Sequence, residues 1–231
     1  MRLLLIRHGQ TPANVRGALE TARPGPRLTE LGREQAAAIP DALAGEQIAA
    51  IYVSPLIRTS DTAGPLATSL GLDRREREGL QEVEAGRLEG RTDKRAIRKY
   101  MGTIFAWADG QLERAMPGGP TGREFFRRFD AALSDIAADH ASEDTIVVVS
   151  HGAAIRVWAS SRSRNLPDDY VKHHQVDNTG IVALDGSPTE GWIAETWGGE
   201  PVGGAELGDP AAPDPTGDAT TSPVEQGYPI E

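Results

Sequence analysis

The sequence predicts a three-layer α/β/α fold built around a mainly parallel central sheet. Three short apolar runs, at residues 2 to 6, 49 to 53 and 145 to 149, are typical of strands in a sheet that is covered on both faces. Helical patterns separate these runs, and strands that alternate with helices form parallel β–α–β units. At 231 residues the chain is long enough to bury the core of such a domain.

The segments between the apolar runs carry the signals of amphipathic helices. Thr29 is a candidate N-cap for a helix that follows Pro26, and Ser54, followed by Pro55, is a candidate N-cap for the next one. Large apolar residues recur at three- and four-residue steps between residues 122 and 140, at Phe125, Phe129, Leu133 and Ile136.

The acidic charge of the chain is concentrated in its last quarter. The net charge is −10, but all 24 Lys and Arg residues lie at or before Lys172, whereas 11 of the 34 acidic residues lie after it, so residues 1 to 172 carry +1. The body of the chain can therefore hold an anion pocket. We expect one folded domain over residues 1 to 200. We expect residues 201 to 231, an acidic Pro- and Gly-rich tail, to be disordered or loosely packed.

Several classes of protein are excluded by simple patterns. No apolar run approaches the roughly 20 residues that span a bilayer, and no basic stripe or zinc-finger pattern predicts binding to nucleic acid. The chain has no cysteine, which excludes disulfides and thiolate metal sites, and no Gly-Lys dipeptide, which excludes a P-loop. These patterns favour a cytoplasmic protein without a membrane or nucleic-acid partner.

Polar side chains follow each of the three predicted strands. Arg7 and His8 follow the first strand, Arg58 lies shortly after the second, and His151 and Gly152 follow the third. Because the carboxyl ends of parallel strands meet at one edge of a sheet, where ligands commonly bind, we expect these side chains to converge. The histidines would then meet although 143 positions separate them in the sequence.

This set of side chains suits the transfer of a phosphoryl group. The planar guanidinium groups of Arg7 and Arg58 match a tetrahedral oxyanion and neutralise its charge. A neutral histidine such as His8 can attack phosphorus and become a covalent carrier, which divides one displacement into two. Gly152 allows the backbone to approach the anion closely. A phosphate that arrives with the substrate would explain the charged residues at the end of a buried strand.

The leaving oxygen in such a reaction needs a proton, which a carboxylic acid with a raised pKa can donate. The segment from residue 80 to 90, "LQEVEAGRLEG", offers Glu82, Glu84 and Glu89. The residues alone do not choose among the three.

Five segments together resemble the histidine phosphatase superfamily, in the branch that includes cofactor-dependent phosphoglycerate mutases and small phosphatases. They are "RHGQTPAN", "LTELGREQA", "SPLIRTSDTA", "QEVEAGRLEG" and "VVVSHG", and they occur in the order of that family between Met1 and about Thr196. The resemblance implies a phosphoglycerate mutase-like fold, with residues 1 to 200 as a histidine phosphatase catalytic domain. One departure is Val83-Glu84-Ala85, where the family usually has a hydrophobic residue, Asp and an aromatic residue.

The resemblance also implies roles for individual residues. His8 would be the phosphorylated nucleophile, and Glu82 would be the proton donor because it begins the glutamate segment. Arg7, Arg58 and His151 would hold the phosphoryl group. The predicted catalytic residues are thus His8, Glu82, Arg7, Arg58 and His151, and the predicted substrate-binding residues are Thr11, Asn14 and Gly152.

The leading functional hypothesis is a phosphatase that hydrolyses a small phosphorylated metabolite, a phosphomonoester, with no metal or other cofactor. One alternative is a phosphoglycerate mutase-type transfer between hydroxyl groups, and another is a catalytically silent phosphate-binding module. Only 68 residues separate Glu82 from His151, which leaves little chain for the enclosing loops that a mutase needs. The hypothesis also allows for a homodimer.

Overall fold

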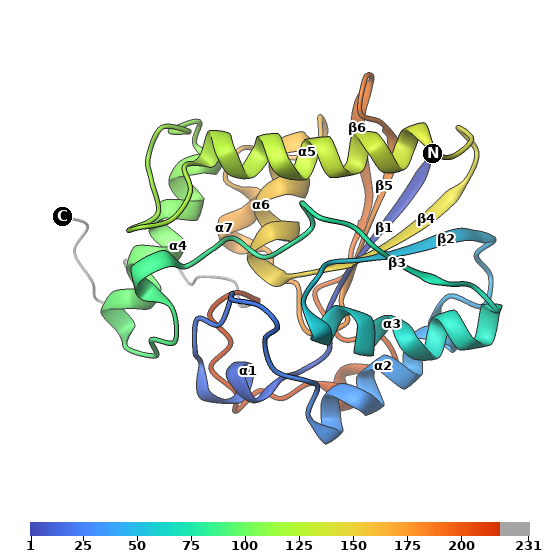
Figure 1. Ribbon diagram of the computed structural model, residues 1–231, viewed down its shortest axis with the longest axis horizontal. Coiled ribbons are helices and arrows are strands. Elements are labelled where there is room, and N and C mark those ends of the chain that lie inside the picture. The colour runs from blue at the N-terminus through green and yellow to red at the C-terminus, as the bar shows by residue number, and fades with distance from the viewer. Residues whose placement is uncertain (218–231) are drawn as a thin grey trace.

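The computed structural model describes residues 1 to 217, in which a six-stranded sheet lies between two layers of helices (Figure 1). The order in the sheet is β3-β2-β4-β1-β5-β6. The first four of these strands are parallel, whereas β5 is antiparallel to β1 and to β6. The predicted mainly parallel sheet is therefore confirmed. The strands are β1 (Arg2–Arg7), β2 (Ile48–Val53), β3 (Arg74–Glu76), β4 (Thr145–Ser150), β5 (Ile181–Ser187) and β6 (Gly191–Trp197).

The helices cover both faces of the sheet, as the three-layer prediction requires (Figure 1). One face packs against α2 (Glu30–Ala42) and α3 (Ile57–Leu70), and the other against α4 (Lys94–Ala108), α5 (Gly122–Ala138) and α6 (Gly152–Arg162). The short helices are α1 (Pro12–Arg16) and α7 (Tyr170–His173), with 3₁₀ turns η1 (Gly86–Leu88) and η2 (Ala205–Leu207). No helix within residues 1 to 217 is long and apolar enough to cross a membrane.

The alternation of side chains along β1 decides where its last residue points. Leu4 and Ile6 belong to the core beneath α2 and α3, whereas Leu3 and Leu5 belong to the core beneath α4, α5 and α6. Successive residues of a strand face opposite sides of the sheet, so Arg7 follows Leu3 and Leu5 onto the α6 side. The guanidinium of Arg7 therefore lies beside the start of α6, and it is fully buried.

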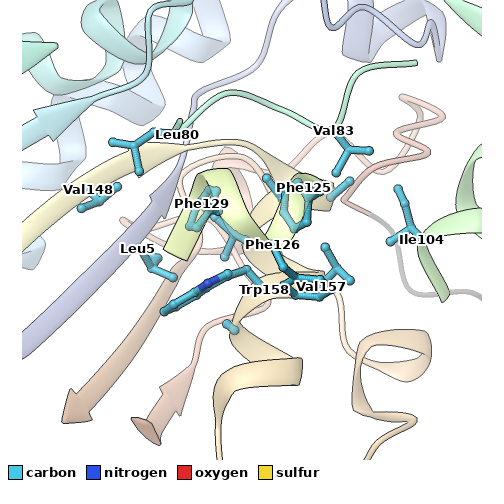
Figure 2. Packing of buried hydrophobic residues seen from close by; sticks show 14 of the residues in the cluster. Leu5, Leu80, Val83, Ile104, Phe125, Phe126, Phe129, Val148, Val157 and Trp158 are labelled. Carbon is cyan, nitrogen blue, oxygen red and sulfur yellow. The ribbon is translucent and has the colours of Figure 1, made fainter. Parts of the chain in front are cut away.

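An aromatic core fixes the loop that carries the glutamate segment. Phe125, Phe126 and Phe129 of α5 are buried, as the spacing of the sequence predicts for two of them, and the ring of Phe125 contacts Phe126 edge-on and Phe129 at a tilt. Figure 2 shows Leu80 and Val83 in the same cluster, so the residues on either side of Glu82 are anchored in the core. Burial of such apolar side chains contributes about 1.5 to 3 kcal/mol each.

The two predicted helix starts have different outcomes. Thr29 caps α2, because its hydroxyl accepts a hydrogen bond from the backbone N–H of Gly32, and that prediction is confirmed. The prediction that Ser54 is an N-cap is wrong, because α3 begins at Ile57 and its cap position is occupied by Leu56, which makes no side-chain cap. The side chain of Ser54 instead reaches the end of the neighbouring strand β4.

Residues 201 to 217 cross the helices on the α1 and α2 side and lie against the body of the molecule. Pro201 is buried, Gln35 donates a hydrogen bond to the carbonyl oxygen of Leu207 (2.7 Å), and Pro213 packs on Gly17. This arrangement differs from the disordered or loosely packed tail that its composition indicates. Residues 218 to 231 of that predicted tail lie outside the described residues.

Candidate active site

The carboxyl ends of β1, β4 and β2 bring the predicted residues together. Arg7 pairs with Ser150 in the sheet, and the N–H of His8 donates to the carbonyl oxygen of Ser150 at 3.0 Å. His8 and His151 therefore follow neighbouring strands, and their ring centroids lie 5.2 Å apart. The convergence expected from the sequence is observed, since β4 also lies beside β2, which leads to Arg58.

The hydrogen bonds of His8 determine which ring nitrogen is free to react. Its Nδ1 lies 2.8 Å from the carbonyl oxygen of Gly9, which can only accept a hydrogen bond, so Nδ1 carries the proton. Burial, followed by the charges of Arg58 and Arg7, holds the pKa of His8 well below its ordinary value. The ring is therefore neutral near pH 7, and its Nε2 has a lone pair that can attack an electrophile.

In His151 the other ring nitrogen is engaged by the protein. Its Nε2 lies 2.7 Å from the hydroxyl oxygen of Ser54, and its Nδ1 has no hydrogen-bond partner among residues 1 to 217. Burial and the charge of Arg58 lower the pKa of His151 well below its ordinary value, so this ring is neutral as well. When Ser54 donates to Nε2, the proton of His151 resides on Nδ1 and is available to an acceptor.

The two arginines supply buried positive charge. Arg7 donates from Nη1 to the carbonyl oxygen of Val176 (3.0 Å), and Arg58 donates from Nη2 to the carbonyl oxygen of Glu20 (3.2 Å). Burial lowers the pKa of Arg58 to about 10, which still leaves it a cation at neutral pH. Arg58 is thus a charged donor inside the protein, and the buried guanidinium of Arg7 lies on the other side of the site.

Several buried donors of this site lack an acceptor within the described part of the chain. They are Nε of Arg7, Nε and Nη1 of Arg58, and Nδ1 of His151. Leaving a buried donor unsatisfied costs about 1 to 3 kcal/mol, and more when it is charged, so such a set is stable only if an anion completes it. The chemistry of the donors suits phosphate. No cluster of His, Asp and Glu within residues 1 to 217 could hold a metal ion.

Glu82 lies against the start of α6. Its Oε1 accepts hydrogen bonds from the N–H groups of Val83 and Ala154, both at 2.8 Å, and its Oε2 accepts one from Ala153 at 3.2 Å. Burial raises the pKa of Glu82, while these N–H groups and Arg58 oppose the rise. Oε2 has the weaker interaction, so it is the oxygen better able to carry a proton.

Two residues that the sequence interpretation missed hold this glutamate in place. The guanidinium of Arg128, on α5, donates to the carbonyl oxygens of Gln81 (2.9 Å) and Glu82 (2.6 Å). The hydroxyl of Tyr100 donates to the carbonyl oxygen of Val83 at 2.7 Å. Neither residue carries a sequence signal beyond its place in an amphipathic helix. Together they fix both sides of the Glu82 peptide unit.

Of the three predicted substrate-binding residues, two lie beside Arg7 and the third, Thr11, positions one of them. Thr11 caps α1, and its hydroxyl donates to Oδ1 of Asn14 at 2.9 Å, so it positions Asn14. The amide Nδ2 of Asn14 donates to Asp214, which also contacts Arg7. A Cβ atom at Gly152 would lie 2.8 Å from Nε of Arg7, so this close approach requires glycine. Asn14 and Gly152 thus both lie beside the Arg7 site.

The backbone around His8 is fixed by two further residues that were not predicted. Asn178 donates from Nδ2 to the carbonyl oxygen of His8 (2.9 Å), and Thr62 accepts from the N–H of Gly9 (2.9 Å). Asn178 belongs to an Asp-Asn-Thr-Gly run directly before β5. That polar run at the start of a strand is the signal that could have identified it.

Comparisons with known proteins agree with this arrangement. The PE-PGRS family protein PE_PGRS11 of Mycobacterium tuberculosis is 37% identical over 203 residues, which cover 81% of this chain but 34% of that protein, so this chain spans about a third of its length. Phosphoserine phosphatase 1 of Hydrogenobacter thermophilus is 28% identical over 156 residues, covering 68% of this chain and 73% of the phosphatase. The structure of mycobacterial glucosyl-3-phosphoglycerate phosphatase superposes with a TM-score of 0.72 at 27% identity, covering 85% of this chain and 98% of that one.

The family comparison covers nearly all of the folded body. The model of the histidine phosphatase superfamily (branch 1) matches residues 3 to 198, which include both histidines, both arginines and Glu82. The fold, with its mainly parallel sheet, agrees with that of phosphoglycerate mutase-like structures. On these grounds the chain belongs to branch 1 of the histidine phosphatase superfamily.

Proposed function

We propose that this chain is a metal-independent phosphatase that hydrolyses a small phosphomonoester through a phosphohistidine at His8. The observation that carries the proposal is the neutral, buried ring of His8, whose Nδ1 is committed to Gly9 beside the unsatisfied donors of Arg58 and His151. A nucleophile next to a ready-made anion cradle is the arrangement that phosphoryl transfer needs.

In the first step, Nε2 of His8 attacks phosphorus while the bond from phosphorus to the leaving oxygen breaks. The guanidinium groups and the Nδ1–H of His151 stabilise the charge on the phosphoryl oxygens. The raised pKa of Glu82 keeps a fraction of this carboxyl protonated, so its Oε2 can give a proton to the departing oxygen. The products are a free alcohol and phosphohistidine, with Glu82 as a carboxylate.

In the second step, water replaces the alcohol. The Glu82 carboxylate accepts a proton from water as the water oxygen attacks phosphorus, and the bond from phosphorus to Nε2 of His8 breaks. Inorganic phosphate leaves, His8 returns to its neutral form, and Glu82 is protonated again. Each group therefore ends the cycle in its starting state.

The chain between Glu82 and His151 supports a phosphatase over a mutase. More than half of it is used by α4, α5 and β4, all of which contribute to the core. A mutase must keep water away from its intermediate while the substrate reorients, which requires enclosing loops. The remainder is divided among three connections, at residues 83 to 93, 109 to 121 and 139 to 144, and none of them is a long insertion that could enclose the site.

The test of the proposal is turnover of p-nitrophenyl phosphate with a chelator present, together with product analysis on 3-phosphoglycerate and catalytic 2,3-bisphosphoglycerate. We expect release of inorganic phosphate from suitable monoesters, unaffected by the chelator. Conversion of 3-phosphoglycerate to 2-phosphoglycerate with negligible phosphate release would make the chain a mutase. A protein that binds phosphate but turns over neither substrate would be the silent module.

The proposal also includes expectations about domain division, cellular location and oligomeric state, and a separate experiment tests each of them. The division into a catalytic domain (residues 1 to 200) and an acidic tail (residues 201 to 231) is tested by expressing residues 1 to 200 alone. We also propose a cytoplasmic location, because a chain without cysteine needs no oxidising compartment to form disulfides. Cell fractionation tests it. The homodimer is tested by light scattering.

A further inference from the structure

A carboxylate from the C-terminal tail occupies the Arg7 side of the site. Oδ2 of Asp214 lies 2.5 Å from Nη2 of Arg7, and Oδ1 accepts a hydrogen bond from Nδ2 of Asn14 at 3.2 Å. Asp214 is only 8% exposed, and Arg7 is fully buried. A carboxylate thus engages both a guanidinium and an amide that we assign to the phosphoryl group of the substrate.

The residues that follow Asp214 are held by the same face of the site. The hydroxyl of Thr216 accepts from Nη2 of Arg7 (3.1 Å), and its carbonyl oxygen accepts from Nη1 of the buried Arg156 (3.0 Å). The carbonyl oxygen of Gly217 accepts from the N–H of Val176 at 3.1 Å. These bonds place the backbone of residues 214 to 217 directly over Arg7.

The tail is held by polar contacts and does not form a dry apolar interface with the site. A cavity of about 380 Å³ lies between tail and body, lined from the body by Gln10, Gln35 and Asn178 and from the tail by Asp209 and Asp214, among others. Polar cavities of this size hold water, so water can replace the hydrogen bonds of the tail when it leaves. The contact is therefore specific and can be exchanged.

A phosphoryl group and the carboxylate of Asp214 are competing ligands for Arg7. Both N–H groups of Nη2 are engaged by the tail, through Asp214 and Thr216, and Nη1 is engaged by Val176. Two anions that share one buried cation also repel each other strongly. A phosphomonoester can gain the full interaction with Arg7 only after Asp214 has moved away.

We infer that residues 209 to 217 are an intramolecular ligand of the phosphate site, in which the Asp214 carboxylate holds Arg7 and Asn14 until a phosphoryl group displaces it. The inference rests on the proposed function, because it takes these two residues as phosphate ligands. The apparent affinity for phosphate is then the affinity of the open site multiplied by the fraction of molecules in which the tail has left Arg7. It leaves kcat unchanged, since it has already departed from the substrate complex.

Calorimetric titration of the full chain with inorganic phosphate tests this inference through two different variants. Asp214→Asn keeps the shape of the side chain but removes its charge, and Gly217→Ala adds a Cβ that would lie 1.8 Å from Nη1 of Arg7 and so displaces the segment. We expect both variants to bind phosphate at least about tenfold more tightly than the unmodified chain, because the competitor is weakened. The KM for p-nitrophenyl phosphate should fall in parallel while kcat stays constant.

Glu206→Gln is the matched control, because it removes an equal charge from an exposed position of the same tail, in η2. Its affinity for phosphate should equal that of the unmodified chain. Equal or weaker binding by Asp214→Asn and Gly217→Ala, or a fall in kcat, would overturn the inference and make the tail a part of the substrate site. If no form binds phosphate or turns over p-nitrophenyl phosphate, the proposed function fails instead.

The displacement itself can be observed because the chain has no cysteine. Ala211→Cys introduces a unique attachment point for a spin label at an exposed position of the tail. Addition of inorganic phosphate should convert an immobilised spectrum to a mobile one, with a midpoint that matches the calorimetric Kd. An immobilised spectrum at a phosphate concentration that saturates the calorimetric signal would contradict displacement.

Discussion

His8 and His151 occupy equivalent positions but have opposite hydrogen-bonding patterns. Each directly follows a buried parallel strand, each is buried, and each has a pKa held well below its ordinary value. His8 donates a hydrogen bond from Nδ1 to a carbonyl oxygen, whereas the Nε2 of His151 is hydrogen-bonded to the hydroxyl of Ser54. The partner of each ring, and not its burial, therefore distinguishes the nucleophile that we propose from the group that we propose binds phosphoryl oxygen.

The largest expected effect comes from removing His8, the proposed nucleophile. His8→Ala should reduce kcat for p-nitrophenyl phosphate by at least about 10⁴-fold, because it removes the ring nitrogen that attacks phosphorus in the proposed first step. Steady-state kinetics measures the loss. His173→Ala, which removes an exposed histidine, should leave kcat unchanged. A residual rate within a hundredfold of the unmodified enzyme would show that His8 is not the nucleophile.

Glu82→Gln should produce the next largest effect, and the effect should depend on the leaving group. Hydrolysis of an alkyl phosphate should slow by about 10²- to 10⁴-fold, because its oxygen needs a proton, whereas p-nitrophenyl phosphate should lose less than about tenfold. Glu84→Gln, at a half-exposed carboxylate of the same segment, is the control and should change both rates by less than about twofold. Equal losses on both substrates would assign Glu82 a structural role.

The unmodified enzyme and Glu82→Gln should differ in the pH dependence of kcat/KM for the alkyl phosphate. The rate requires protonated Glu82, whose pKa is raised by burial, so activity falls as pH rises through that pKa. It also requires neutral His8, whose pKa is lowered, so activity is retained until pH falls well below the usual range of histidine. The optimum should lie on the acid side, and Glu82→Gln should abolish the alkaline limb. An unchanged alkaline limb in that variant would assign it to another group.

Arg128→Lys should have a smaller effect, transmitted through Glu82. Lysine cannot reproduce the forked contact with the carbonyl oxygens of Gln81 and Glu82, so the carboxyl is held less firmly. We expect about a tenfold loss in kcat for the alkyl phosphate and little loss for p-nitrophenyl phosphate. Arg127→Lys is the matched control, because Arg127 is the exposed neighbour on the same helix. A loss shared by both substrates would indicate general destabilisation.

Ser54→Ala should have the smallest effect of the series. It removes one hydrogen bond that orients His151, and a hydrogen bond of this kind is worth about 1 kcal/mol, so kcat should fall about fivefold. Ser54→Thr, which keeps the hydroxyl, should recover most of the rate. If the alanine variant were as active as the unmodified enzyme, the orientation of His151 would not depend on Ser54.

The sequence predicts the framework of the site well because the strands and their ends are local patterns. The apolar runs before His8 and His151 predict β1 and β4, and the rule that parallel strands end at one edge brings the two rings together. The strands β5 and β6 were not predicted, because they form an antiparallel hairpin that is only partly buried and reads less clearly as apolar.

The contacts between distant segments could not be predicted from the sequence. Ser54 has the composition of a helix cap, and only the register of β2 beside β4 makes it a partner of His151. Arg128 looks like an exposed helix residue until α5 packs over the Glu82 loop. Asp214 belongs to a segment whose composition indicates weak packing, and its contact with Arg7 depends on a buried charge 207 positions away in the sequence.

The position of the covalent intermediate tests the central distinction between the two histidines most directly. The enzyme is mixed with substrate, quenched rapidly in alkali, because phosphohistidine is labile in acid, and the product is analysed by peptide mass mapping and ³¹P NMR. We predict one phosphoryl group per chain, bonded to Nε2 of His8, and none in His8→Ala. Phosphate on His151, on Nδ1 of His8, or on neither ring while turnover continues would contradict the account.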